Sequence, residues 1–287
     1  MVEERRQESA IEHAEELLET LEVMHSPIDL FQITASEEPL LILKNGDYRN
    51  RFDGQLEYHR KQRRFVLFFN TKYDDSITGS HHPRTRFSLA HELGHYFLDR
   101  HREYLLRGGR VHGSSGEFSS LIGIEREADA FAAGLLMPRK LMVRQVNSAE
   151  LTLARIDELA KLFGTSRVST AIRCVQLSHF PCALIGIRDG SVAWTFRSSC
   201  FKDKGCYPRD RAAELPLVAR TQWLKMAKGD YGQFRQDVEL GQWFQTYDWE
   251  DLDQIYLTAA FFPAPSMSPL IVLVTGDEDD FAPLEED

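Results

Sequence analysis

Two segments of helix-forming residues, 86–101 and 122–136, constrain the fold and the chemistry of this chain more than any other feature. The first contains the sequence HELGH, in which His91 and His95 are four residues apart. On a helix this spacing puts both imidazoles on one face, one turn apart, where they can bind a single Zn²⁺. Glu92 lies beside them and can accept a proton from a water molecule that the metal activates. The segment therefore predicts a catalytic metal site.

The second segment offers a third ligand, because a catalytic zinc needs three protein ligands and one open position. In the sequence EREAD, Glu125 and Asp129 are four residues apart and share one helix face. We predict that Glu125 binds the metal and that Asp129 accepts a hydrogen bond from a ligand imidazole, most simply that of His91. Glu127 is the alternative ligand. It lies about 200° around the helix from Glu125, so both cannot serve.

Hydrolysis at such a site would also require an oxyanion donor and, for a polypeptide substrate, a place for an extended chain. Four side chains are candidate donors, and the sequence does not rank them: His112, Tyr96, Arg86 and Tyr104. Residues 64–70 are predicted to form a strand, either an edge strand that pairs with substrate or a buried interior strand. The glycine-rich residues 107–119 are either a flap over the site or a plain connector.

Composition narrows the classes of partner and the compartment. The 287 residues carry 44 Asp and Glu against 34 Lys and Arg, a net charge of −10 that opposes non-specific attraction to nucleic acid or anionic membrane. The N-terminal segment is charged and lacks an apolar signal core, and the apolar runs are too short to cross a bilayer. The 4 cysteines show no CxxC pair and are predicted to be reduced thiols. We expect a cytoplasmic protein without a membrane partner.

Apolar periodicity and turn signals predict the remaining elements. We expect helices at 3–25, 28–34, 152–162, 166–177 and 212–227, and strands at 40–43, 55–59, 183–187, 192–196, 254–261 and 270–275. Asp189-Gly190 is typical of a tight hairpin turn, and Gly164 fits the left-handed position that ends a helix.

The helix pair at 152–177 looks like a helix-turn-helix, and basic residues outnumber acidic ones in this part of the chain. DNA contact through residues 149–179 is therefore one interpretation. We favour the other, in which the pair packs on the core that carries the two motifs or docks a protein partner.

The two motifs together resemble the ImmA/IrrE metallo-endopeptidases, through RFSLAHELGH at 86–95 and EREADAFAAGLLMP at 125–138. The resemblance implies that His91, His95 and Glu125 are zinc ligands and that Glu92 is the general acid and base. Family members are cytoplasmic proteases that cut a partner transcriptional repressor, often one with a helix-turn-helix domain, and so release its genes. Many relatives carry histidine where this chain has Asp99 and asparagine where it has Asp129, and neither change touches a predicted ligand.

The resemblance and the predicted elements together give an α+β fold. We expect a minimal zincin-like peptidase domain at 1–148, with a small sheet and the active-site helices, followed by the helix-turn-helix-like segment at 149–179. A C-terminal α+β domain at 180–276 is comparable with the GAF-like sensory domain of some relatives, by analogy only. Residues 277–287 form an acidic tail that we expect to be disordered.

Three functions from different classes follow. The first is a zinc-dependent endopeptidase that cleaves a repressor encoded nearby, with roles in transcription regulation and the stress response. The second is a DNA-binding regulator with a structural metal, and the third is a toxin- or antitoxin-type interaction protein. Zn²⁺ is the expected ion, although site affinity alone does not decide between Zn²⁺, Mn²⁺ and other divalent ions.

Overall fold

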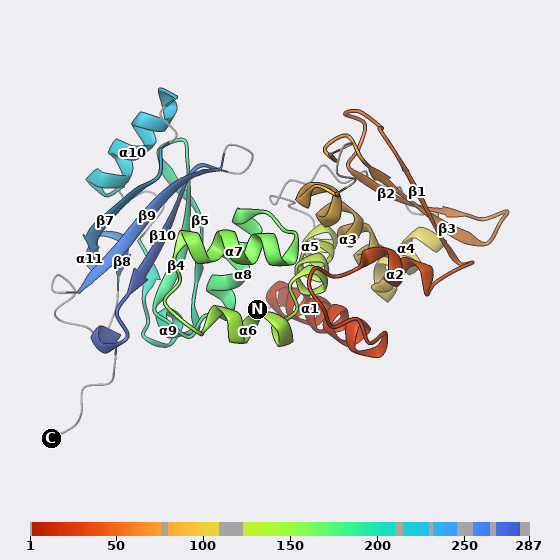
Figure 1. Ribbon diagram of the computed structural model, residues 1–287, viewed down its shortest axis with the longest axis horizontal. Helices are drawn as coiled ribbons and strands as arrows, with labels where there is room; N and C mark the ends of the chain where they lie inside the picture. The colour runs from red at the N-terminus through yellow and green to blue at the C-terminus, as the bar shows by residue number, and fades with distance from the viewer. Residues whose placement is uncertain are drawn as a thin grey trace, which may run out of the picture. The chain divides into compact units, whose positions relative to one another are not determined.

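The computed structural model describes residues 2–75, 80–108, 123–209, 215–229, 232–245, 255–264 and 268–281 (Figure 1). The described chain is a mixed α+β protein, as the sequence predicts. It divides into two compact units, Met1–Leu141 with Leu159–Ser169, and Met142–Glu158 with Thr170–Asp287. Three helices each contribute residues to both units: α6 (Arg139–Val146), α7 (Leu153–Phe163) and α8 (Arg167–Leu177).

The first unit combines a small sheet with the helices that carry both motifs. The elements are α1 (Val2–Thr20), α2 (Leu30–Ala35), β1 (Leu41–Gly46), β2 (Gly54–His59), β3 (Arg64–Asn70), α3 (Pro83–Phe97), α4 (Asp99–Leu106) and α5 (Gly123–Leu136). The sheet order is β1-β3-β2, with β3 parallel to β1 and antiparallel to β2. The strands predicted at 55–59 and 64–70 are therefore present, and they are antiparallel neighbours. The interior alternative holds for residues 64–70, whereas the edge-strand interpretation is wrong, because β3 is bonded on both sides.

Helix α3 crosses α5 closely because a glycine lies at the contact. A Cβ built on Gly94 would lie 3.2 Å from the Cα of Ala128 and 3.2 Å from the Cβ of Phe131. On its other side α5 packs against α1, where Gly134 closely approaches the backbone of Ile11. Since α3 carries HELGH and α5 carries EREAD, this packing brings the two motifs together.

The predicted helix 86–101 is two helices, which corrects the sequence interpretation. It begins earlier, at Pro83, whose fixed φ suits the first turn, and the His82 side chain caps it. At Leu98 the backbone is extended, with φ −74° and ψ 110°, so α3 ends and α4 starts in a new direction. The sequence contains no proline or glycine at this point, and the break was not predictable from propensity. Its consequence is that the residues of α4 turn back toward α3.

The second unit is built on an antiparallel sheet of order β5-β4-β10-β9-β7 (Figure 1). Its elements are β4 (Cys182–Arg188), β5 (Ser191–Arg197), α9 (Ser199–Asp203), β6 (Tyr207–Pro208), α10 (Leu217–Ala227), β7 (Phe234–Glu239), α11 (Leu240–Trp243), β8 (Phe244–Gln245), β9 (Tyr256–Ala264), β10 (Ser268–Gly276) and the 3-10 turn η2 (Asp279–Phe281). The β4–β5 hairpin is confirmed, with positive φ at both Asp189 and Gly190. Strands β6, β7 and β8 were not predicted, because their polar or very short sequences lack clear alternation.

The helix pair α7–α8 is present, and Gly164 has the predicted left-handed backbone, with φ +64°. The N–H of Thr165 bonds the carbonyl of Ala160, which satisfies the last turn of α7. This geometry is common to many helix pairs, so a helix-turn-helix function stays a prediction. Within the described ranges, every helix is too short or too polar to span a bilayer.

Candidate metal centre

Three side chains from α3 and α5 converge on one point. Nε2 of His91 lies 3.1 Å from Nε2 of His95 and 3.1 Å from Oε2 of Glu125, and Nε2 of His95 lies 3.6 Å from Oε1 of Glu125. Among the described residues these three form the one group of His, Cys, Asp or Glu whose ligand atoms all lie within 4.8 Å of one another. The spacing fits a tetrahedral zinc, because bonds of about 2.0–2.1 Å place neighbouring ligand atoms roughly 3.3 Å apart.

Glu92 is buried beside the imidazole pair, with only 1% of its surface exposed. It belongs to the same turn of α3 as His91. The start of β2 presses against it, since a Cβ on Gly54 would lie 2.8 Å from Cγ and 3.1 Å from Oε1 of Glu92. The absence of a side chain at Gly54 therefore leaves the room that the Glu92 carboxylate occupies.

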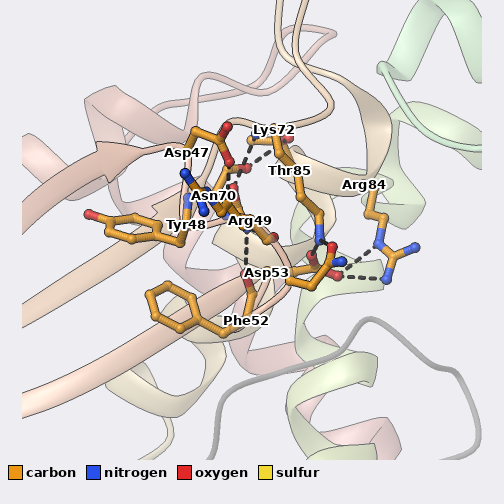
Figure 2. Close-up of polar contacts among 10 residues, drawn as sticks. Asp47, Tyr48, Arg49, Phe52, Asp53, Asn70, Lys72, Arg84 and Thr85 are labelled. Carbon is orange, nitrogen blue, oxygen red and sulfur yellow. Dashed lines mark hydrogen bonds and ion pairs between the residues drawn. The ribbon is translucent and has the colours of Figure 1, made fainter.

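A polar framework holds the start of β2 in place (Figure 2). The Asn70 side chain accepts hydrogen bonds from the N–H groups of Tyr48 and Lys72, and it donates to the carbonyls of Arg49 and Phe52 at 2.8 and 2.6 Å.

Next to Gly54, the buried Asp53 accepts from Arg84 at the beginning of α3 and pairs with Lys72. Figure 2 shows Asp53 between Arg84 and the loop residues Arg49 and Phe52, whose carbonyls accept hydrogen bonds from Asn70. The strand that touches Glu92 is thus bonded to the helix that carries it.

Asp129 lies within hydrogen-bond distance of the His91 imidazole. Its Oδ1 lies 2.9 Å from Nδ1 of His91, so the imidazole donates there and turns Nε2 toward Glu125 and His95. In a metal site this bond selects the tautomer with a lone pair on Nε2. Asp129 and Glu125 are one turn apart on α5, which explains how one helix supplies both contacts.

Burial and hydrogen bonds shift the pKa values of the three clustered side chains. Burial alone would lower the pKa of His91, but hydrogen bonds to Asp129 and Glu125 outweigh it and raise the pKa to about 10. Burial would raise the pKa of Glu125, yet the hydrogen bond from the His91 imidazole and the nearby imidazole of His95 bring it far below its usual value. The pKa of His95 is lowered, chiefly by burial. Without metal, a proton on His91 supplies the positive charge that the carboxylates favour.

His101 and Glu127 form a further contact beside the site, which sequence reasoning missed. His101, on α4, places Nδ1 3.1 Å from Nδ1 of His95 and Nε2 3.1 Å from Oε2 of Glu127. Its imidazole is 1% exposed. No sequence pattern links His101 with Glu127, because the change of direction at Leu98 brings the two side chains together. Glu127, weighed above as an alternative ligand, faces His101 instead.

The structure describes three of the four candidate oxyanion donors, Tyr96, Arg86 and Tyr104. The Tyr96 hydroxyl donates to Glu37 at 2.7 Å, and Arg86 donates to the carbonyls of Gly164 and Ile28. Tyr104 is exposed on α4. No hydrogen bond joins any of these three to the metal centre within the described residues, and His112 lies outside them, as do residues 109–119 of the glycine-rich segment.

The cysteines do not form a second metal group. All 4 are free thiols, and within the parts of the chain described they do not meet the ligand spacing of a metal site. Burial raises the pKa of Cys182 and of Cys174 to about 12, so both stay protonated and unreactive at neutral pH. Among the described residues, the candidate metal ligands are therefore those of α3 and α5.

One comparison with known proteins matches the part of the chain that contains this site. The family model of peptidase M78, described as the IrrE N-terminal-like domain, matches residues 78–175 and so includes HELGH and EREAD. Comparison with curated proteins gives no match. Among solved structures, the chain is similar to one titled Mycobacterium tuberculosis transcriptional regulator, with a TM-score of 0.54 and 12% identity over 97% of this chain and 94% of that chain. At that identity the likeness supports the fold alone. The match to the domain confirms the resemblance found in the sequence: residues 78–175 carry the metallopeptidase domain of the ImmA/IrrE family.

Proposed function

We propose that this protein is a zinc-dependent endopeptidase that cleaves a partner protein, a helix-turn-helix transcriptional repressor encoded nearby, and thereby switches gene expression. One observation carries the proposal. Two imidazoles and one carboxylate converge at the spacing of zinc ligands, and a buried glutamate that is not one of them lies in the same helical turn. The peptidase family of residues 78–175 supports the same reaction class.

The chemistry divides among the residues as follows. His91, His95 and Glu125 would hold the ion, which as a Lewis acid makes water a nucleophile at neutral pH. Glu92 takes the proton of the attacking water and later passes it to the leaving amine. Burial of Glu92 keeps bulk water away from this proton. Asp129 keeps the His91 imidazole in the orientation that ligation needs.

An extended substrate has an edge strand available beside the site. Strand β2 is at one end of the sheet order, and its first residue, Gly54, touches Glu92. A substrate backbone that pairs with the outer edge of β2 would pass the metal centre at Gly54, in the manner of β-augmentation. The sequence had suggested residues 64–70 for this role, and β2 takes their place in the proposal.

The test is incubation of the zinc-loaded chain with the repressor encoded beside its gene, read by intact mass. We expect two product masses that sum to the repressor plus one water. The Glu92→Gln variant should bind zinc and fold normally yet produce no fragments, because the amide cannot accept the proton. Equal cleavage by Glu92→Gln would overturn the mechanism. A DNA-binding regulator or an interaction protein with a structural metal, by contrast, predicts that Glu92→Gln behaves like the wild type.

A further inference from the structure

His101 is placed so that it determines what His95 can do. Nδ1 of His95 faces Nδ1 of His101, while Nε2 of His95 faces the ligand atoms of His91 and Glu125. A neutral imidazole carries one N–H and one lone pair, so only one of the two His95 nitrogens can ligate a metal. The contact with His101 therefore decides between two tautomers of His95, of which one can bind zinc through Nε2.

Glu127 selects the tautomer of His101 in turn. An ionised carboxylate only accepts hydrogen bonds, so Nε2 of His101 must donate to Oε2 of Glu127, 3.1 Å away. The neutral His101 then has its lone pair on Nδ1, where it accepts from Nδ1–H of His95. This leaves the lone pair of His95 on Nε2, directed at the metal centre. The opposite arrangement would turn a lone pair of His101 against the carboxylate.

We propose that Glu127 and His101 are positioning residues of the zinc site, a relay that holds His95 in the tautomer and orientation of a ligand. The proposal rests on the metal centre of the proposed function and adds residues that neither motif assigns. The two ligand histidines are thus oriented differently: Asp129 bonds His91 directly, whereas Glu127 acts on His95 through a second imidazole. Outer hydrogen-bond partners of this kind typically contribute about 10–100-fold to metal affinity.

The competing explanation is a purely structural one. The relay also ties α4 to α3 and α5, and Arg100 and Arg6 lie 3.4 and 3.8 Å from Oε1 of Glu127. A structural bond predicts lower stability on mutation and an unchanged zinc affinity of the folded chain. The relay predicts a loss of zinc affinity even where folding is intact, so the two explanations differ in what they predict for metal binding.

The experiment measures the zinc dissociation constant of the full-length chain by competition with a chromophoric chelator, with folding checked by circular dichroism. His101→Phe removes both bonds and should weaken zinc binding about 10–100-fold. His101→Asn keeps an acceptor near the Nδ1 position but loses the link to Glu127, and its affinity should fall between wild type and His101→Phe. Glu127→Leu should weaken binding, and adding it to His101→Phe should cost little more, because both act through one chain of bonds.

Tyr96→Phe is the matched control. Tyr96 lies on the same helix, α3, and the change removes its partly buried hydrogen bond to Glu37, which should lower stability without changing zinc affinity. If the folded His101→Phe variant binds zinc as tightly as the wild type, the relay is refuted and the proposed function stands. Should His101→Phe fail to fold, an unchanged zinc affinity in His101→Asn and Glu127→Leu refutes the relay equally. A wild-type chain that binds no zinc refutes the proposed function and the relay together.

Discussion

The contact between Gly54 and Glu92 gives the sharpest mutational prediction. Gly54→Ala would place a methyl group 2.8 Å from Cγ of Glu92 and 3.1 Å from the backbone carbonyl of Ser88. Ordinary contacts to a Cβ begin at 3.4 Å, so Glu92 must move by about 0.6 Å to make room. Neither neighbour can move easily, because the Ser88 carbonyl is part of the backbone of α3 and the Glu92 side chain is buried. The backbone of Gly54 does not require glycine, since its φ is not among the positive values of the chain.

The size of the effect follows from that displacement. A misplacement of about 1 Å at a catalytic group costs roughly 100-fold in rate, so a shift of about 0.6 Å predicts roughly a tenfold loss in kcat/KM. Overpacking should also cost roughly 1–3 kcal/mol of stability. Zinc affinity should be unchanged, because the methyl group meets none of the three ligands. The assay is the rate of repressor cleavage by the zinc-loaded variant, with chelator competition run in parallel.

Gly46→Ala is the control for this prediction. A Cβ at Gly46 meets the Tyr48 ring at 3.5 Å, an ordinary contact in the same sheet, and should leave cleavage unchanged. Full activity of Gly54→Ala would refute the placement of β2 against Glu92. A loss of zinc in step with a loss of activity would show that the methyl group disturbs the ligands instead of the glutamate.

Three further outcomes are expected. Zinc binding at pH 8 should release about one proton, because the pKa of His91 is about 10 without metal whereas that of His95 is lowered. Calorimetry in buffers of different ionisation enthalpy measures this proton release. No release would contradict the assignment of His91 as the protonated ligand. Asp129→Leu should weaken zinc binding about 10–100-fold. Asp129→Asn should weaken it much less, because the amide oxygen still accepts a hydrogen bond from His91. Equal losses of zinc affinity in the two variants would show that the charge of Asp129 matters more than its hydrogen bond. Asn70→Ala should lower the free energy of unfolding by about 2–3 kcal/mol in urea titrations, because it leaves the carbonyls of Arg49 and Phe52 without the hydrogen bonds that Asn70 donates. A loss under about 0.5 kcal/mol would show that water replaces the amide.

Zinc affinity should increase with pH, because the metal competes with a proton on His91. A group whose pKa is raised by the folded, metal-free site holds its proton more tightly there, so the metal must displace it. Affinity should therefore rise by about tenfold per pH unit as the pH increases toward about 10, the pKa of His91, and level off above it. Chelator competition between pH 7 and pH 9 measures this slope, and a flat profile would contradict it.

Much of the site was predictable because its chemistry is local in sequence. The spacing of His91 and His95 on a helix, and of Glu125 and Asp129 on another, is a matter of helical period, and the structure brings these four residues together. The sequence predicts that the two helices meet, but it does not predict the close crossing that Gly94 permits between them.

The contacts that were missed are those set by tertiary packing. The break at Leu98 has no sequence signal, and without it His101 would continue along the first helix, away from His95. The contact of Gly54 with Glu92 depends on how the sheet lies against α3, which no local pattern specifies. In the second unit, short polar strands such as β7 take their structure from neighbouring strands and not from their own propensity.

The proposed function requires that His91, His95 and Glu125 bind one zinc ion and leave one coordination position open. The most direct measurement is the zinc K-edge X-ray absorption spectrum of the full-length chain loaded with one equivalent of zinc. We predict nitrogen and oxygen neighbours at about 2.0–2.2 Å, with the outer-shell scattering of two imidazoles and no sulfur. A shell of sulfur at about 2.3 Å, or scattering from fewer than two imidazoles, would place the metal elsewhere and contradict the account.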